Sequence, residues 1–188
     1  MITVDDLQAH PLDRVHRLIE PGPVILISTR QHGTPNVMTN GFNMMMRHAP
    51  PIIACTVGPW DHSYQALLET GECVISVPAA DMAATVVDIG NCSGSEVDKF
   101  REFGLTAVAG EKVQAPLIAE CHANIECRVA DASLVDAYNL FLLEPVRAWT
   151  DPSQPDPRLL HHRGDGTFTV DGPVMDLKAR MTKWQYLL

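Results

Sequence analysis

The sequence of 188 residues lacks the short motifs that mark several large classes of enzyme. It has no G-x-G-x-x-G, the glycine pattern of dinucleotide-binding folds, and no P-loop for a nucleoside triphosphate. It has no H-E-x-x-H and no C-x-x-C, and its adjacent His161 and His162 would point to opposite faces of a strand. We therefore expect no separate nucleotide-binding domain and no bound metal.

Basic residues and long apolar runs are also scarce. The chain has 14 Lys and Arg against 23 Asp and Glu, a formal charge of −9, and no basic run that could neutralise phosphates of a nucleic acid. No apolar run approaches the ~18 residues of a membrane span. Asp5 and Asp6 stand where a signal peptide would carry basic residues. These features predict a cytoplasmic protein with neither a nucleic-acid nor a membrane partner.

Five cysteines are present, an odd number, at positions 55, 73, 92, 121 and 127. In a chain of this kind we expect reduced, small apolar side chains and no disulfide framework. Apolar residues make up 46% and charged residues 20%, which is the balance of a globular protein. We expect residues 1–188 to form a single domain.

Short apolar runs bounded by turn residues predict most of the secondary structure. The expected strands are Val24–Thr29, Ile52–Val57, Cys73–Val77, Ala119–Val129, Asn139–Trp149 and Thr167–Val170. The expected helices are Pro11–Glu20, Ser63–Thr70, Ala80–Ile89 and one that runs from Ser95 to Gly104. Polar and apolar residues alternate strictly along Ala119–Val129, so one face of that strand should meet water. Strands and helices do not alternate regularly, which predicts a mainly β fold: an antiparallel, Greek-key type β-barrel with inserted short helices.

Amide and hydroxyl side chains gather in the stretch Asn36–Tyr64. The residues Asn36–Asn40 are expected to form a polar turn, and the stretch contributes Asn36, Thr39, Asn40, Asn43, Thr56, Ser63 and Tyr64. Such groups suit a neutral, hydrogen-bonding ligand. The alternative is a turn whose amides satisfy only their own backbone. The three methionines at positions 44–46 are expected to fill the core.

The loop Asn91–Ser95 precedes the helix expected after Ser95, and Lys99 falls on the first turn of that helix. Backbone N–H groups at a helix N-terminus favour an anion, and Lys99 could neutralise a phosphate there. Alternatively, Lys99 is a solvated lysine paired with Asp98 or Glu102.

Several of these pieces, in this order, resemble the flavin reductase-like family of FMN-binding split barrels. They are Asn36-Val37-Met38-Thr39, Ala49-Pro50-Pro51, His62-Ser63-Tyr64, Ser93-Gly94, Asp98-Lys99-Phe100, Ala115-Pro116-Leu117-Ile118 and Glu126-Cys127. The resemblance implies bound FMN, with ring contacts on the Asn36–Asn40 segment. The full set of residues expected to bind the cofactor is Asn36, Met38, Thr39, Asn40, Thr56, Ser63, Tyr64, Cys92, Ser93 and Lys99.

The resemblance implies an NAD(P)H-dependent flavin reductase that passes electrons through FMN to free flavin or to a partner monooxygenase. NADH or NADPH would stack on the flavin in the same cleft. A flavoredoxin-like carrier, reduced by a partner electron-transfer protein, needs the same FMN contacts and stays open. No catalytic side chain is predicted, and the departure from the family pattern at Gly41-Phe42-Asn43 leaves the electron acceptor open.

A third alternative is a cysteine hydrolase. Gly90-Asn91-Cys92-Ser93-Gly94 has the form of a nucleophile elbow, with His122 or His162 as a possible base. That function requires a strand leading into the elbow and a parallel sheet, whereas the predicted neighbours are a helix and antiparallel strands.

The resemblance also implies a twofold homodimer in which the neighbouring subunit completes the flavin cleft. The apolar C-terminal stretch Val174–Leu188 is either a contact with that partner or a last helix packed on its own barrel.

Overall fold

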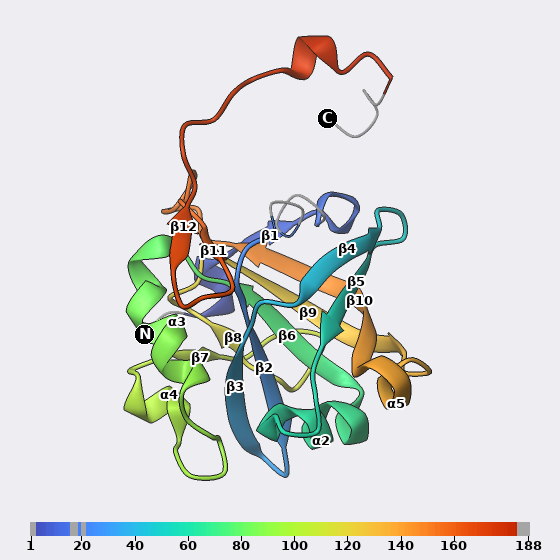
Figure 1. The fold of residues 1–188 in the computed structure, drawn as a ribbon, viewed down its shortest axis with the longest axis vertical. Helices are drawn as coiled ribbons and strands as arrows, with labels where there is room; N and C mark the ends of the chain where they lie inside the picture. The colour runs from blue at the N-terminus through green and yellow to red at the C-terminus, as the bar shows by residue number, and fades with distance from the viewer. Residues whose placement is uncertain (1–2, 16–18, 20–21, 184–188) are drawn as a thin grey trace.

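The structure, a computed structural model, describes residues 3–15, 19 and 22–183 (Figure 1). Its strands are β1 (Gln8–His10), β2 (Ile25–Gln31), β3 (Thr34–Asn40), β4 (Asn43–Arg47), β5 (Ile52–Thr56), β6 (Glu72–Val77), β7 (Ala107–Val108), β8 (Leu117–Ile118), β9 (Ala123–Asp131), β10 (Leu140–Thr150), β11 (Leu160–His162) and β12 (Phe168–Val170). Its α-helices are α2 (His62–Thr70), α3 (Ala83–Gly90), α4 (Lys99–Glu102) and α5 (Val135–Tyr138), and its 3-10 turns are η1 (Val4–Asp6), η2 (Leu12–Arg14), η3 (Ala80–Met82) and η4 (Lys178–Arg180).

One eight-stranded sheet dominates the fold. Its main path runs β3-β2-β6-β9-β10-β5-β4, with β1 added beside β10, and every described pairing in it is antiparallel. Strands β2 and β3 form a tight hairpin whose two-residue turn is His32-Gly33. Both residues have positive φ, as such a turn requires. The mainly β, antiparallel prediction is confirmed.

The sheet curls into a split barrel whose two ends are joined by side chains instead of a full ladder. Strands β3 and β4 follow each other in the chain but stand at opposite ends of the sheet path. Across this seam Asn40 Nδ2 donates to the Thr56 carbonyl at 2.8 Å, and Asn43 Nδ2 donates to the Pro23 carbonyl at 3.1 Å. The backbone N–H of Thr56 also donates to the Phe42 carbonyl. Two asparagines thus supply hydrogen bonds where strand pairing stops.

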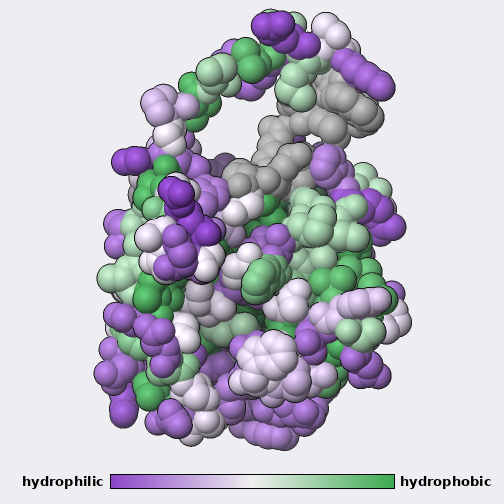
Figure 2. Space-filling view, in the orientation of Figure 1, coloured by the Kyte–Doolittle hydropathy of each residue, from purple (hydrophilic) through white to green (hydrophobic). Residues whose placement is uncertain are grey.

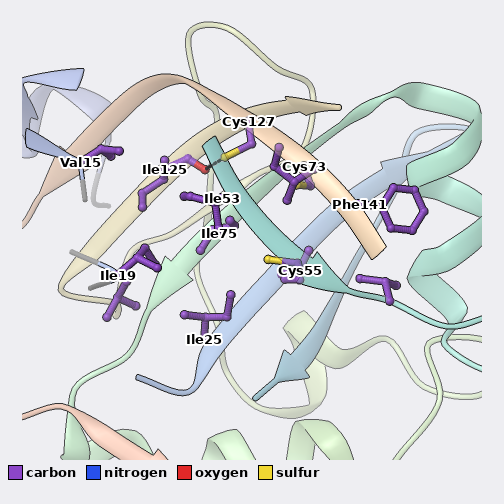
Figure 3. Close-up of a cluster of buried hydrophobic side chains, with 14 of the residues drawn as sticks. Val15, Ile19, Ile25, Ile53, Cys55, Cys73, Ile75, Ile125, Cys127 and Phe141 are labelled. Carbon is purple, nitrogen blue, oxygen red and sulfur yellow. Dashed lines mark hydrogen bonds between the residues drawn. The ribbon is translucent and has the colours of Figure 1, made fainter. Parts of the chain in front are cut away.

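The interior of the split barrel is apolar. Ile25, Ile53, Ile75, Ile125 and Phe141, which come from five different strands, belong to one cluster and have no exposed surface (Figure 3). Three cysteines belong to the same cluster, at positions 55, 73 and 127. All five cysteines are free thiols, and burial raises the pKa of Cys55, Cys127 and Cys121. The cysteines of the core therefore act as small apolar side chains, as the sequence predicts.

The expectation of a strand over Ala119–Val129 with a water-facing side holds only in part, because the strand β9 begins at Ala123 and, of the polar positions expected to face water, only Arg128 is exposed. In β9 the polar residues Asn124 and Glu126 are as buried as their apolar neighbours, because the segment between β7 and β8 covers this face. Asn124 accepts from the Ile118 N–H and donates back to the Ile118 carbonyl. The Glu126 carboxylate accepts from the backbone N–H groups of residues 111, 112 and 113 and from Trp149 Nε1. At Asn124 and Glu126 the alternation therefore marks buried hydrogen-bonding side chains and not a surface that faces solvent.

Two expectations for the central stretch also need correction. Residues 36–40 continue strand β3 and do not form a turn, because the reversal occurs earlier, at His32 and Gly33. Met44 and Met46 are more than half exposed, since β4 lies at a sheet end with one uncovered face, and only Met45 packs on the core. Figure 2 shows apolar residues gathered over the β4 and β5 side of the molecule.

The helices agree with the sequence in part. Helix α2 ends where Gly71 takes the left-handed conformation, as expected. The helix expected from Ser95 is shorter: α4 begins at Lys99, because Asp98 is its N-cap and accepts from the Arg101 N–H. The predicted helix Pro11–Glu20 begins as η2, and most of its second half lies outside the described residues. No helix in the described ranges is long and apolar enough to cross a membrane.

The C-terminal segment leaves the body of the molecule after β12 (Figure 1). Val174 and Met175 are among the most exposed apolar side chains, and the described part of the segment forms only the short turn η4. Within residues 172–183 there is thus no last helix packed on the barrel, and Trp184–Leu188 lie outside the described residues.

We predict that Glu126→Ala destabilises the protein by at least about 2 kcal/mol, since it removes the acceptor of four hydrogen bonds, two of which come from the buried donors Val113 N–H and Trp149 Nε1. Urea unfolding measures this as a lower midpoint at unchanged slope. Glu144 lies exposed on the adjacent strand β10, so Glu144→Ala is the control and should cost no more than about 0.5 kcal/mol. Equal effects of the two substitutions would show that Glu126 does not hold the segment over the sheet.

Candidate functional site

A cleft of about 290 Å³ opens beside strand β3, between the N-terminus of α2 and the segment that joins α3 to α4. Its walls are formed by Asn36, Met38, Thr39, Trp60, Asp61, His62, Ile89, Gly90, Asn91, Cys92, Ser93, Gly94 and Lys99. Six of the ten residues predicted to bind a cofactor therefore line one cleft.

Strand β3 provides one wall through Asn36, Met38 and Thr39. In the described part of the chain β3 pairs with β2 alone, so its other edge is unpaired and faces α3, α4 and α2. Asn36 Nδ2 donates to Ser63 Oγ at 2.9 Å, which fixes the amide. Thr39 Oγ1 donates to the Val86 carbonyl at 2.5 Å and attaches the strand to α3. The wall is held firmly, while backbone groups along the edge remain available to a ligand.

Lys99 is the one basic residue in the cleft wall, and it is only 5% exposed. Its Nζ donates to the Ile89 carbonyl at 2.8 Å. Burial lowers the pKa of Lys99, while the nearby Cys92 and Asp61 act in the opposite direction. The alternative of a solvated surface lysine is therefore wrong, because α4 turns this side chain inward against α3. A buried ammonium with one carbonyl partner has donors left for an anion.

Gly94 brings the segment after α3 into close contact with β3 and α2. A Cβ atom at this position would collide with the Asn36 side chain and would lie 2.6 Å from His62 Cδ2. Ser93 Oγ lies 2.8 Å from Ser95 Oγ in the same segment. Absence of a side chain at Gly94 is therefore what lets the segment close over the cleft.

Seven lining residues were not in the predicted set: Trp60, Asp61, His62, Ile89, Gly90, Asn91 and Gly94. Asp61 is the N-cap of α2, and its Oδ2 accepts from the Gly58 N–H at 2.9 Å. Trp60 is 76% exposed, and its ring lies over Gly58, where a Cβ would overlap it. The sequence feature that could have indicated Trp60, Asp61 and His62 is the turn at Gly58-Pro59 just before the expected helix. Residues that follow such a turn lie at the N-terminus of the helix. The cleft is therefore bordered by the N-terminus of α2 as well as by Lys99 at the start of α4, the helix that the sequence suggested.

Four predicted residues lie outside this cleft. Asn40 and Thr56 hydrogen-bond to each other at the seam of the barrel, and Thr56 lines a separate shallow hollow with Phe42 and Met44. Ser63 is buried behind Asn36. Tyr64 packs on the core, with its ring edge against Phe141 at 6.0 Å between centroids.

Cys92 lies at the cleft, but not in a nucleophile elbow. The residues before it form helix α3, and the surrounding sheet is antiparallel, so the strand-turn-helix of that motif is absent from the described structure. Its Sγ lies against the Asp88 and Ile89 carbonyls at 3.6 and 3.9 Å. His122 has a pKa lowered by burial and contacts the segment around Asp151 and Gln154. The cysteine hydrolase is therefore not supported.

Comparison with known families gives a match to the flavin reductase like domain over residues 17–168. The chain belongs to this flavin reductase-like family. The family resemblance inferred from the sequence is thereby confirmed.

Two relatives at the sequence level carry names that assign no activity. YddH of Escherichia coli is 30% identical, and the match covers 86% of this chain and 93% of that protein. A protein of Archaeoglobus fulgidus is 33% identical over 110 residues, 58% of this chain and 62% of its own length.

Solved structures of low sequence identity share the fold. An FMN-binding domain of a flavin reductases-like enzyme from Shewanella baltica superposes with a TM-score of 0.84 at 24% identity, covering 90% of this chain and 96% of that one. Flavoredoxin of Desulfovibrio vulgaris gives 0.74 at 24% identity, covering 82% and 89%. An NADH:FAD oxidoreductase of Streptomyces globisporus gives 0.68 at 23% identity, covering 82% and 87%.

Proposed function

We propose that this flavin reductase-like protein binds FMN in the cleft beside β3 and transfers electrons from NADH or NADPH to a free flavin or a partner acceptor. The observation that carries the proposal is the buried Lys99 in a cleft that also contains amide and hydroxyl side chains and the unpaired edge of β3. FMN combines an anionic phosphate with a flat, polar-edged ring, so it needs both kinds of contact.

The phosphate end suits the side of the cleft where Lys99, Ser93 and the N-terminus of α2 meet. Lys99 offers a charge-assisted bond, and the first N–H groups of the nine-residue helix α2 add a favourable dipole. The Asp61 carboxylate at this end is engaged with the Gly58 N–H. Among the described residues no carboxylate accepts a hydrogen bond from the buried Lys99 ammonium, and burying an unpaired charge is unfavourable in free energy. A bound anion would pair with this charge.

The ring suits the β3 wall. Backbone N–H and C=O groups on the free edge, with the fixed amide of Asn36, can bond the polar edge of an isoalloxazine. Met38 offers a polarizable surface. Bound FMN supplies the capacity to accept a hydride and release electrons, and the chain's own residues bind the ring, orient it and limit access of water.

The nicotinamide donor is proposed to use the same cleft, since the chain carries no dinucleotide-binding motif. A structural neighbour described as an NADH:FAD oxidoreductase supports this donor. A second candidate, a carrier reduced by a partner protein, is favoured by the likeness to flavoredoxin. Both use the same FMN contacts, so the donor has to be measured. A partner monooxygenase and a cytoplasmic location remain predictions.

The test of the function has two steps. The purified protein is expected to carry FMN, or to take it up in a fluorescence titration. Mixed anaerobically with NADH or NADPH in a stopped-flow instrument, the FMN-bound protein should lose its flavin absorbance with one of the two. Reduction by neither donor, with FMN bound, would favour the carrier. No flavin binding at all would overturn the proposal.

Lys99→Ala is expected to weaken the binding of FMN roughly ten- to a hundredfold and to leave the binding of riboflavin nearly unchanged. The reason is that a charge-assisted hydrogen bond to the phosphate, which riboflavin lacks, is worth about 1.5–3 kcal/mol. Since burial lowers the pKa of Lys99, the preference of the unmodified protein for FMN should fall as the pH rises through a value below 10.5. Arg101→Ala, which removes an exposed cation from the same helix, is the control. Equal weakening of both ligands by Lys99→Ala would place the phosphate elsewhere.

We further propose that the protein is a homodimer whose partner covers the open side of the cleft. Large apolar side chains stand exposed on the surface: Trp60 on the cleft wall, and Phe42 and Met44 at the hollow beside the start of β4. The C-terminal segment adds Val174 and Met175, which find no place on their own barrel (Figure 1). An arm of this kind is suited to a neighbouring subunit.

Sedimentation of the FMN-bound protein tests the dimer. The full chain is expected to sediment as a dimer, and a variant truncated after Pro173 should shift toward monomer at the same concentration, with weaker FMN binding. A full-length monomer that retains FMN would show that one chain completes the site. A truncated variant that stays dimeric would assign the contact to the β4 surface.

A further inference from the structure

A second hollow of about 290 Å³ adjoins the cleft and lies under the β11–β12 hairpin, which stands beside α3 (Figure 1). It is lined by Val24, Thr39, Gly41, Val86, Val87, Gly90, Asn91, His162, Gly166 and Phe168. Thr39, Gly90 and Asn91 belong to both spaces, so the hollow and the cleft share one wall.

The hairpin that covers the hollow is anchored to the barrel. Val24 N–H donates to the carbonyl of the buried Leu160 at 2.7 Å. His161 bridges two segments, because its Nδ1 lies 3.1 Å from the Gly22 carbonyl and its Nε2 lies 2.8 Å from Asp171 Oδ1. These contacts hold β11 beside the start of β2, and the cover of the hollow is a built part of the fold.

Aromatic and branched apolar groups face each other across the hollow. His162 and Phe168 are register partners in the hairpin, with ring centroids 4.9 Å apart at 40°. His162 Nε2 accepts from the Gly166 N–H at 3.2 Å, so in this arrangement the ring proton sits on Nδ1. Val86 and Val87 of α3 form another part of the lining. The lining offers flat and apolar surface with few polar groups.

The charge and size of the hollow limit what it can hold. Its lining residues include no Lys, Arg, Asp or Glu, so a pyrophosphate or carboxylate placed there would lack a cationic partner. Its volume lies at the lower end of the roughly 300–1,000 Å³ typical of ligand sites. A whole dinucleotide does not fit these limits, whereas a small ring system does.

We propose that this hollow binds an uncharged, planar aromatic compound of one or two rings, beside the ligand in the cleft. The inference rests on the proposed function in one respect, since a bound ring would reach the flavin only across the shared wall at Thr39 and Gly90. It extends that function by assigning a chemical class to the electron acceptor. The acceptor would be a small neutral aromatic molecule that contacts the valines of α3 and the rings of the β11–β12 hairpin.

The probe for this site is 2-naphthol, a neutral bicyclic compound, titrated calorimetrically into the FMN-bound protein. The unmodified protein is expected to bind it with a measurable dissociation constant below 1 mM, an affinity of about −4 kcal/mol or better. Val87→Glu places a carboxylate in the lining at a position that is already 37% exposed, so the fold should tolerate it. We expect this variant to bind 2-naphthol at least tenfold more weakly and FMN within twofold of the unmodified protein.

Val170→Glu is the matched control, because Val170 is also 37% exposed, lies on β12 and does not line the hollow. It should change neither affinity. The inference is overturned if 2-naphthol does not bind, if both substitutions weaken it equally, or if Val87→Glu weakens FMN as much as 2-naphthol, which would assign the hollow to the flavin itself. If the protein binds no FMN, the proposed function fails, and the same titration of the protein alone decides whether the aromatic site exists.

Discussion

The unpaired edge of β3 is the constraint on which the rest of the structure depends. A sheet edge presents backbone donors and acceptors that need partners, and natural proteins pair or cover such edges. Here β2 pairs one side of β3, while α3, α4 and the N-terminus of α2 gather along the other. Side-chain hydrogen bonds join them to the strand at two places: Thr39 bonds to α3, and Asn36 bonds to Ser63 of α2. The cleft lies along the strand beside these two contacts. The polar edge of the proposed FMN would supply hydrogen-bonding partners for this side of the strand.

An open edge requires that the split barrel be stabilised elsewhere. Part of that support comes from β9, which carries the buried carboxylate of Glu126 and the buried amide of Asn124. Both bind backbone groups of the segment that spans β7 and β8, and Ser28 of β2 also donates to the Pro116 carbonyl of this segment at 2.5 Å. Hydrogen bonds to a buried carboxylate are strong and costly to break, so they fix the sheet while its β3 edge stays free.

Local patterns predicted the elements well and their surroundings less well. The strand β10, the start of α2 and the αL glycine at its end follow from apolar spacing and turn chemistry alone. Alternation in β9 has the right period, but the chain segment that buries its polar face lies several residues upstream and pairs through side chains, which no local pattern reveals. Lys99 shows the same limit: its type and place on α4 were predictable, but its inward direction depends on the packing of α4 against α3.

The polar residues of the central stretch divide between two roles that composition cannot separate. Asn40, Asn43 and Thr56 hydrogen-bond across the seam and close the barrel, whereas Asn36 faces the cleft with Ser63 as its support. Asn36 and Asn40 point to the same side of β3 because side chains alternate along a strand, and they are separated only by Met38. A substitution at Asn40 would therefore affect the proposed site only indirectly, by changing the conformation of β3. A substitution at Asn36 would remove a side chain that lines the cleft. The seam that closes the barrel and the proposed ligand site lie on one face of the same strand, two side chains apart, and this is why they look alike in the sequence.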